Sequence, residues 1–388
     1  MPDAVILSAV RTAVGRGKAD GSLADVHPID LSALVIQEVV KRANLDPADI
    51  DDLLWGCAMP EGSQGLNIGR LALLRARIPV HVPAATVNRF CSSGLQTVAG
   101  AAQSIMSGMA DVVIAGGVEM MSQVPMSGWH TRLHPEMTES MISMGLTAER
   151  VADRWKVSRE DQDAYALESH RKAAAAQAEG RFDEQIVPVP VKRVTWKGAA
   201  KQVTEGHFAV DELVRPDTSL ERLAKLKPAF KPGGTVTAGN ASPYSDGAAA
   251  VVVASGDYAK AHGLTPIARF VTFAAAGVEP DIMGVGPIQA VPKALKRARL
   301  GVSDLALIEF NEAFASQALA VKRELRFPDD RLNVNGGAIA LGHPLGATGS
   351  KLVTQLLHEL GRRGGGHGLV TMCIGGGMGA AGVFEVFG

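Results

Sequence analysis

The sequence predicts an α/β protein made of two similar halves, with a long segment inserted between them. Apolar runs typical of buried strands, such as Asp111–Gly117 and Gly368–Cys373, alternate with amphipathic helical patterns in both parts of the chain. This alternation favours sheets covered by helices on both faces. Two stretches of the first half also recur in the second half in the same order, which favours a duplication.

The repeat rests on two pairs of segments. Lys41–Pro60 and Lys296–Ala315 each contain a helix end, a short turn and an apolar strand that leads into a polar loop. Val87–Gln96 and Val334–Gly346 each run from a strand into a loop of small residues and then into an amphipathic helix. If a pseudo-twofold axis relates the halves, these two loops should meet at the same end of the sheets.

The domain boundaries follow from the place where this pattern loosens. We expect the first half at residues 1–121 plus about 242–268, and the second half at 269–388. Residues 122–241 form the inserted segment, which includes a predicted helix at Ser158–Gly180 with acidic residues in its first turn. Long excursions of this kind often carry a binding function.

Composition restricts the class of protein. The chain has 388 residues, is 46% hydrophobic, and balances 39 Lys and Arg against 40 Asp and Glu, so no positive field for nucleic acid is expected. No apolar run reaches the roughly 18 residues that cross a bilayer. The first strand is expected to start at Ala4, which leaves no room for a cleavable targeting segment. We therefore expect a cytoplasmic protein that binds neither nucleic acid nor membrane.

The three cysteines are Cys57, Cys91 and Cys373, and their spacing favours neither a disulfide framework nor a zinc site. Cys91 directly precedes a predicted helix, where free N–H groups and partial positive charge lower the pKa of a thiol. This position makes Cys91 a candidate nucleophile. The alternative interpretation is a small buried apolar residue, because free cysteine is among the most buried residue types.

Cys373 ends an apolar strand and enters a glycine run that includes Gly375. Glycines leave backbone N–H groups accessible, as an oxyanion hole requires. A dinucleotide-binding loop is the competing interpretation, but a helix should follow such a loop, whereas AGVFEVF predicts a strand. A nicotinamide cofactor is therefore disfavoured.

His343 lies in the loop that is the repeat partner of the Cys91 loop, among small residues that leave its ring free to enter a site. A single histidine is more often structural than catalytic, but the repeat favours a catalytic role here. Asn311 and Glu312 follow an apolar strand. Taken alone, Asn311 is better explained as a helix cap than as a group that orients a water or a substrate oxygen.

Together these segments resemble the thiolase family over essentially the whole chain. Four motifs occur in the order and at the spacing of that family: CSSGLQ with Cys91, NEAFA with Asn311, GGAIALGHPLGATG with His343, and CIGGGMG with Cys373. Thr235–Ala250 and Lys225–Phe230 resemble segments that line the coenzyme A tunnel. The resemblance implies a five-layered αβαβα core, residues 122–241 as a loop domain over the coenzyme A site, and a homodimer or homotetramer.

The resemblance also implies roles for individual residues. Cys91 would be the acylated nucleophile, His343 would take its proton, and Cys373 would act as acid and base at the substrate's α-carbon. Asn311, through a water, would form one oxyanion hole with His343, and the backbone N–H groups of Cys91 and Gly375 would form the other. Substrate contacts are implied at six positions: Ser242 and Phe230 on the pantetheine arm, Arg215 nearer the nucleotide, and Met144, Met283 and Phe314 around the acyl group. Coenzyme A would be a co-substrate, with no metal and no permanently bound cofactor.

One motif departs from the biosynthetic branch of the family. Biosynthetic acetoacetyl-CoA thiolases usually carry His-Met-Gly where this chain has Ser143-Met144-Gly145. The resemblance therefore favours a 3-ketoacyl-CoA thiolase of fatty acid degradation (beta-oxidation), with a hydratase/dehydrogenase subunit as a candidate partner. Biosynthetic condensation of two acetyl-CoA is the alternative. Decarboxylating ketoacyl synthases lack an equivalent of Cys373, and a non-catalytic scaffold would not be expected to retain all four motif residues.

Overall fold

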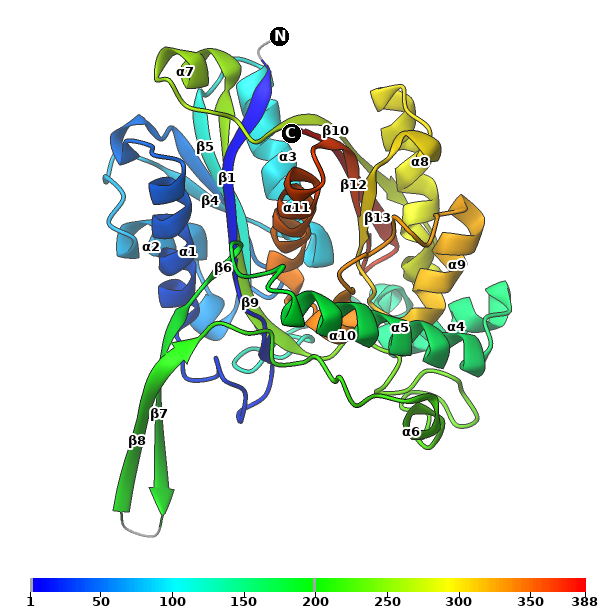
Figure 1. The fold of residues 1–388 in the computed structure, drawn as a ribbon. Coiled ribbons are helices and arrows are strands. Elements are labelled where there is room, and N and C mark those ends of the chain that lie inside the picture. The colour runs from blue at the N-terminus through cyan, green and yellow to red at the C-terminus, as the bar shows by residue number, and fades with distance from the viewer. Residues whose placement is uncertain (1–2, 198–199) are drawn as a thin grey trace.

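Three layers of helices alternate with two layers of strands (Figure 1). The computed structural model describes residues 3–197 and 200–388. The helical layers are α1 (Pro28–Arg42) with α2 (Ile68–Arg75), then α3 (Ser93–Met106) with α11 (Leu345–Arg362), then α8 (Gly286–Ala298) with α9 (Ala315–Leu325). The predicted α/β architecture is confirmed, with α3 and α11 as the central layer.

The strands form two sheets that join at one end. The first half has the order β4-β3-β5-β9-β1, and the second half has the order β10-β13-β12-β11. Their bounds are β4 (Ala84–Val87), β3 (Asp52–Gly56), β5 (Val112–Met120), β9 (Ser245–Ser255), β1 (Ala4–Thr12), β10 (Ala268–Gly277), β13 (Met378–Val386), β12 (Gly366–Ile374) and β11 (Leu307–Phe310). The join is antiparallel and consists of the pairs Val5↔Arg269 and Ile6↔Ala268.

The repeated segments occupy equivalent places in the two halves. Strands β3 and β4 pair in parallel before α3 begins. In the second half, the strand predicted at the start of Val334–Gly346 is wrong, because Val334 lies in a turn. An isolated parallel bridge between Ile308 of β11 and Leu332 precedes that turn. A strand antiparallel to its neighbour then completes each half, β9 beside β5 and β13 beside β12. The loops that open α3 and α11 therefore lie at corresponding positions.

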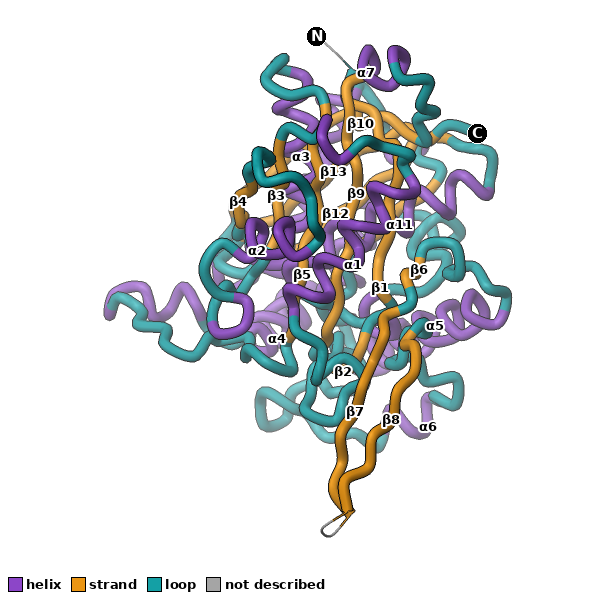
Figure 2. The backbone as a smooth tube through the Cα atoms, turned by 90° about the vertical axis from the view of Figure 1, so that its left-hand side faces the viewer, coloured by secondary structure: helices purple, strands orange, loops and turns teal. Residues whose placement is uncertain are grey.

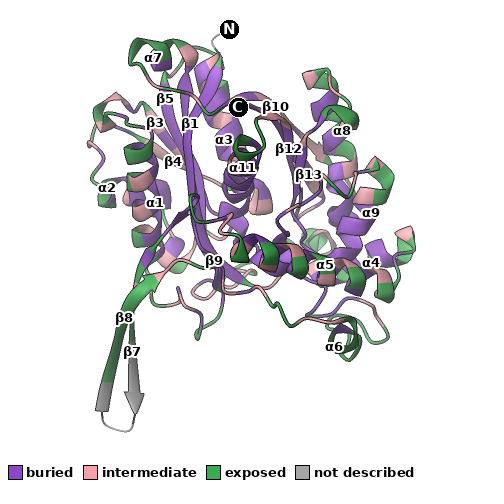
Figure 3. Ribbon diagram, viewed as in Figure 1, coloured by how far each residue is buried: buried purple, intermediate pink, exposed green. Residues whose placement is uncertain are grey.

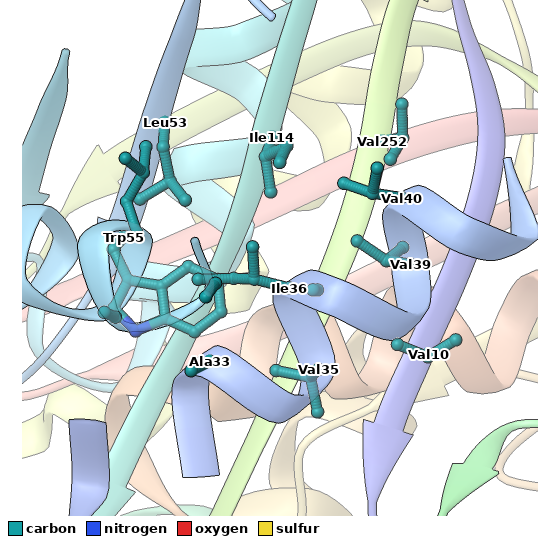
Figure 4. Packing of buried hydrophobic residues seen from close by; sticks show 14 of the residues in the cluster. Val10, Ala33, Val35, Ile36, Val39, Val40, Leu53, Trp55, Ile114 and Val252 are labelled. Atoms are coloured by element: carbon teal, nitrogen blue, oxygen red, sulfur yellow. The ribbon is translucent and has the colours of Figure 1, made fainter. Parts of the chain in front are cut away.

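Apolar spacing explains how the outer helices bind the sheets. Helix α1 starts with Pro28 at a position where its missing N–H costs nothing, and His27 accepts a hydrogen bond from the Ile29 N–H. Its buried face includes Ile36 and Val39, which point toward the sheet (Figure 4). Full burial of each such side chain contributes roughly 1.5–3 kcal/mol.

The central helices approach each other through glycine. A Cβ atom on Gly349 of α11 would lie 2.0 Å from the Leu95 backbone nitrogen, and one on Gly94 of α3 would lie 2.7 Å from the Ser350 nitrogen. No side chain fits between the two backbones at these points. The two helices are buried between the sheets (Figure 3), and their N-terminal ends are consequently held close together.

The segment between the halves contributes two long helices and a projecting hairpin. Helix α4 (Met144–Trp155) is followed by α5 (Arg159–Ala178), whose N-cap Ser158 accepts from the Asp161 N–H. This confirms the helix that was predicted at Ser158–Gly180. Strands β7 (Val189–Lys197) and β8 (Ala200–Phe208) extend away from the layered core (Figure 2). The domain boundaries themselves stay a prediction.

Short elements complete the chain. They are β2 (Gly15–Arg16), β6 (Ile186–Val187), α6 (Leu220–Ala224), α7 (Gly256–Ala261), α10 (Ala338–Leu341) and the 3₁₀ helices η1 (Pro47–Asp49), η2 (Gly62–Gln64), η3 (Phe90–Ser92), η4 (Pro135–Met141), η5 (Pro280–Val285) and η6 (Val302–Asp304). Among the helices in the described residues, none has the length and apolar character needed to cross a membrane.

Candidate active site

A cavity of about 490 Å³ lies where the central helices begin. Its lining includes Cys91 from the start of α3 and His343 from the start of α11. All six residues that were predicted as substrate contacts line the same cavity: Ser242, Phe230, Arg215, Met144, Met283 and Phe314. Cys373, Asn311 and Gly375 do not line it, and their contacts place them beside Cys91 and His343.

Cys91 lies in the 3₁₀ turn η3, immediately before α3, as the sequence predicts. The residue as a whole is partly exposed, but its thiol is enclosed by neighbouring atoms. Burial raises the pKa of the Cys91 thiol to about 11, although the N–H groups of Gly375 and of Cys91 itself act in the opposite direction. The expectation that the helix terminus lowers this pKa is wrong, because removal of water from the thiol outweighs the nearby N–H groups. The sulfur is therefore a neutral thiol that needs a base.

Cys373 is buried near the end of β12, beside Gly375 and close to Cys91. Burial, together with the neighbouring Cys91 thiol, raises the pKa of Cys373 well above its ordinary value. The chain then turns through Gly376 and Gly377, both with positive φ, into β13. The strand predicted after the glycine run is confirmed, and this turn leads into no helix.

His343 is buried, and its backbone N–H and both ring nitrogens have hydrogen-bond partners. Its backbone N–H donates to Ser245 Oγ at 2.9 Å, and its Nδ1 lies 2.6 Å from Thr348 Oγ1. Its Nε2 lies 3.3 Å from Asn311 Nδ2. Burial and the ammonium group of Lys351 lower the pKa of His343 to about 3. The imidazole is therefore neutral and can accept a proton.

Asn311 is not a helix cap, contrary to the expectation from the sequence. Helix α9 begins at Ala315, with Phe314 as its N-cap residue. The chain runs past the site before the helix starts, and this places the Asn311 side chain against His343. Its Oδ1 is buried and has no hydrogen-bond partner among the described residues. An unpaired buried acceptor at this point is suited to hold a water or a substrate atom.

Glu312, next to Asn311, has a structural role. Its carboxylate accepts hydrogen bonds from Ser169 Oγ at 2.6 Å, Asn333 Nδ2 at 2.8 Å and Tyr165 Oη at 3.1 Å. Since Ser169 and Tyr165 belong to α5, these bonds attach the inserted segment to the loop that carries Asn311.

Glu119 makes hydrogen bonds near the site that the sequence did not predict. Its carboxylate, at the end of β5, accepts from the N–H groups of Ala58 and Gly346 at 2.8 Å each, and from Gln64 Nε2 at 2.8 Å. Helix α11 has no side-chain cap of its own at Pro344. A residue of the first half thus caps the helix that follows His343 in the second half.

Thr348 and the basic residues at the cavity were also missed. Thr348 lies five positions after His343, within the first turn of α11, and its small hydroxyl gives no distinctive sequence signal. Arg16 and Lys18 line the cavity together with Arg215. Three cationic side chains in the lining of one cavity favour a ligand that carries phosphate groups.

Close packing shapes one wall of the cavity. The rings of Phe230 and Phe314 meet edge to face, with centroids 6.1 Å apart. A Cβ atom on Gly145 would lie 2.1 Å from the Phe230 ring, so glycine is what lets this ring lie against the start of α4. Ser143 and Met144 line the cavity beside it. Within residues 3–197 and 200–388, no cluster of three His, Cys, Asp or Glu side chains is placed to hold a metal ion.

Comparisons with known proteins agree with this geometry. Residues 4–257 match the family described as thiolase, N-terminal domain, and residues 264–386 match thiolase, C-terminal domain. The chain is 55% identical over 392 residues to a 3-ketoacyl-CoA thiolase of Bacillus subtilis, covering 100% of both chains. It is 46% identical over 397 residues to an acetyl-CoA acetyltransferase of Pseudomonas aeruginosa, covering 98% of each. The crystal structure of human mitochondrial 3-ketoacyl-CoA thiolase matches with a TM-score of 0.89 and 40% identity, over 100% of this chain and 99% of that one.

Proposed function

The chain belongs to the thiolase family of acyltransferases, and we propose that it is a 3-ketoacyl-CoA thiolase that works in fatty acid degradation. In this reaction coenzyme A cleaves a 3-ketoacyl-CoA into acetyl-CoA and an acyl-CoA that is two carbons shorter. The observation that carries the proposal is one cavity that holds a thiol, a neutral imidazole and an apolar pocket with Ser143 beside Met144.

The first half-reaction breaks the carbon–carbon bond. The Cys91 sulfur attacks the 3-keto carbon while His343 Nε2 takes the thiol proton, because the raised pKa of Cys91 leaves little free thiolate. The backbone N–H groups of Cys91 and Gly375 stabilise the resulting oxyanion. When the bond between C2 and C3 breaks, Cys373 gives its proton to C2, and acetyl-CoA departs. The raised pKa of Cys373 keeps this thiol protonated until then.

The second half-reaction transfers the acyl group to coenzyme A. The Cys373 thiolate takes the proton of the incoming coenzyme A thiol, whose sulfur attacks the acyl carbon on Cys91. Collapse of the intermediate releases the shortened acyl-CoA, and Cys91 regains its proton from His343 Nε2. In the first half-reaction, Asn311, with a water, and the protonated His343 supply donors for the thioester oxygen of the departing acetyl unit. All protons balance over the cycle.

Binding of coenzyme A uses the cationic opening and the pantetheine wall. Arg16, Lys18 and Arg215 line the cavity where phosphates would enter, and Ser242 and Phe230 line the path toward Cys91. Coenzyme A is a co-substrate in this scheme, and no metal or permanently bound cofactor takes part.

Ser143 supports the degradative direction. A serine leaves more room beside the acyl pocket than the histidine of the biosynthetic branch, and the flexible Met144 adapts to different acyl shapes. The competing candidate is biosynthetic condensation of two acetyl-CoA, which the similarity to an acetyl-CoA acetyltransferase favours.

Chain-length kinetics test this choice. Each buried methylene contributes about 0.8 kcal/mol, so four more carbons should raise kcat/KM for 3-ketooctanoyl-CoA over acetoacetyl-CoA by about 10-fold, or about 100-fold if fully buried. Ser143→His is the matched variant, and it should move the preference toward the four-carbon substrate. A preference of the wild type for acetoacetyl-CoA by tenfold or more would favour the biosynthetic alternative instead.

A second experiment tests the roles of the two cysteines. Cys373→Ala should still accept an acetyl group on Cys91 from acetyl-CoA, while thiolysis falls by about 100- to 10,000-fold. Near wild-type turnover of this variant would reduce Cys373 to a structural residue.

The proposal extends to assembly and location. The exposed apolar residues Leu66 and Val80, which are 87% and 77% accessible, flank α2 beside the edge strand β4, and they support a homodimer or homotetramer. A cytoplasmic location and a hydratase/dehydrogenase partner subunit belong to the same proposal. Light scattering of the purified protein tests the oligomeric state directly.

A further inference from the structure

We propose that Thr348 is the positioning residue that keeps a proton on Nδ1 of His343, so that Nε2 faces the cavity as the proton acceptor. The inference rests on the proposed function, because that function needs His343 as a base. It adds a residue whose hydroxyl acts only through the histidine ring and touches no substrate atom.

The hydrogen bonds of Thr348 support this assignment. Its hydroxyl has one proton and two neighbours: the Pro344 carbonyl oxygen at 2.8 Å and His343 Nδ1 at 2.6 Å. Donation to the carbonyl four residues earlier is a common arrangement for threonine in a helix. With its proton on Pro344, the Thr348 oxygen can only accept, so His343 Nδ1 must be the donor.

The other ring nitrogen supports the same tautomer. Asn311 Nδ2, a donor, lies 3.3 Å from His343 Nε2. A donor there requires a lone pair on Nε2. With the Asn311 amide oriented as it is here, a proton on Nε2 would instead place two N–H donors against each other and leave one of them buried and unpaired, at a cost of about 1–3 kcal/mol.

The charge of the ring makes the choice of tautomer matter. Burial and Lys351, whose Nζ donates to the Gly342 carbonyl at 3.3 Å, hold the pKa of His343 at about 3. A neutral ring carries one proton, and if it lay on Nε2 the histidine could not accept the Cys91 proton at the atom next to Asn311. With the proton on Nδ1, Nε2 receives the Cys91 proton and then presents it as a hydrogen-bond donor.

The surroundings of Thr348 keep this geometry rigid. Thr348 is fully buried, and the start of its helix is tied to the first half by the bond from the Gly346 N–H to Glu119, 2.8 Å long. Ser245 Oγ accepts from the His343 backbone N–H and so fixes the His343 backbone. A change confined to the Thr348 hydroxyl therefore tests the ring proton with little disturbance of the loop.

Two matched variants make the functional test. Thr348→Val has nearly the same shape but no hydroxyl, and Thr348→Ser retains the hydroxyl. We expect Thr348→Val to lower kcat for thiolysis by about 100-fold, the lower end of general-base contributions, with KM for coenzyme A within about threefold. Thr348→Ser should recover activity to within about threefold of the wild type. Alkylation of Cys91 by iodoacetamide at alkaline pH, where hydroxide removes the thiol proton, should be equal in all three proteins.

A direct observation of the tautomer completes the test. Two-bond ¹H–¹⁵N correlation spectra of the ¹⁵N-histidine-labelled protein should show His343 with its proton on Nδ1, assigned by the signals lost in His343→Gln. A proton on Nε2 in the wild type would overturn the inference, as would wild-type kcat in Thr348→Val or equal losses in Thr348→Val and Thr348→Ser. The spectrum does not depend on turnover, so failure of the thiolase proposal, seen as no acetylation of Cys91, is a separate outcome.

Discussion

The loops that open α3 and α11 occupy equivalent places in the two halves, yet they are held in different ways. The Cys91 loop (residues 88–92) is fixed mainly by local bonds, such as the Phe90 N–H to Asn88 Oδ1 at 2.8 Å, with one longer-range bond from Asn88 Nδ2 to the Ala58 carbonyl at 3.0 Å. Phe90 has a φ of +44°. The His343 loop (residues 342–346) is fixed by distant residues, Ser245 and Glu119. One loop carries Cys91, a partly exposed residue, whereas the other carries the buried residue His343.

This difference shows how a duplicated scaffold can divide the chemistry. The Cys91 loop carries the proposed nucleophile, and a bulky residue with positive φ beside it costs of order 1–3 kcal/mol in backbone strain. The His343 loop carries the proposed proton acceptor, whose ring orientation would have to stay constant. We therefore expect changes in the Cys91 loop to affect activity alone, and changes around the His343 loop to affect both stability and activity.

The largest expected effect comes from the Cys91 loop. Cys91→Ser should lower kcat by about 10,000-fold or more, because the hydroxyl is a far weaker nucleophile, while the apparent Tm stays within about 2 °C of the wild type. The acetyl group from acetyl-CoA should be found on the peptide that contains Cys91, and the control Cys57→Ala should retain it. An acetyl group on Cys57 or Cys373 in the wild type would contradict the assignment.

Asn311, the partner of His343, gives the next largest effect. Asn311→Ala removes the amide that we propose holds the oxyanion water, and kcat should fall by about 100- to 1,000-fold with a small change in KM. Acetylation kinetics of Cys91 by stopped flow measure the loss at the first step. If only KM rises, Asn311 binds substrate and has no role in the transition state.

Glu309 should make the stability of the folded chain depend on pH. The residue at the equivalent position of the first half, Leu54, is apolar and cannot do so. Burial raises the pKa of Glu309 to about 8 from 4.5; Lys351 and Arg11 oppose this rise, and Glu359 and Glu312 add to it. The folded chain keeps a proton that the unfolded chain loses, so this contribution to stability is present below pH 4.5 and lost as pH rises to about 8.

Glu309→Leu, which installs the residue of the first half, should remove this pH dependence. Since one pKa unit corresponds to about 1.4 kcal/mol, the gain in stability over the wild type at alkaline pH should reach a few kcal/mol. Thermal unfolding across the pH range checks the result. A difference between the two proteins that does not vary with pH would show that Glu309 is already ionised in the folded protein.

The smallest expected effect tests the link between the halves. Glu119→Gln keeps the shape of the side chain but places an amide against backbone N–H donors, and it should lower the free energy of unfolding by about 2 kcal/mol, or Tm by about 2–3 °C. Activity should fall as well, because Gly346 follows His343 closely. Glu205→Gln, in an exposed ion pair with Lys192, is the control and should change Tm by less than about 1 °C. Equal Tm values in the two variants would mean that Glu119 does not stabilise the His343 loop.

Local pattern was enough to place much of the fold and part of the site. The strand that contains Cys373 and the helices that follow Cys91 and His343 carry clear apolar periods and were predicted correctly. The strand predicted before Cys91 is present as β4, whereas the strand predicted at Val334 is absent from the described residues. The roles of these residues stay predictions. The cap assigned to Asn311 was wrong, because the helix begins only at Ala315 and no residue near Asn311 indicates this later start.

The remaining site features depend on tertiary structure. Ser245 binds a residue 98 positions away, and Glu119 binds one 227 positions away, so no sequence window contains either contact. The pKa of Cys91 was predicted in the wrong direction for a related reason. The helix terminus is visible in the sequence, whereas the burial that outweighs it is created by segments from both halves.

The contact between Gly94 and Gly349 has an evolutionary consequence. Two copies of a duplicated unit are usually free to drift apart, each under its own selection. Here a single methyl group on either helix would meet the backbone of the other, 2.0 Å away at Gly349 and 2.7 Å away at Gly94. Each copy therefore constrains the residues that the other can accept at these positions.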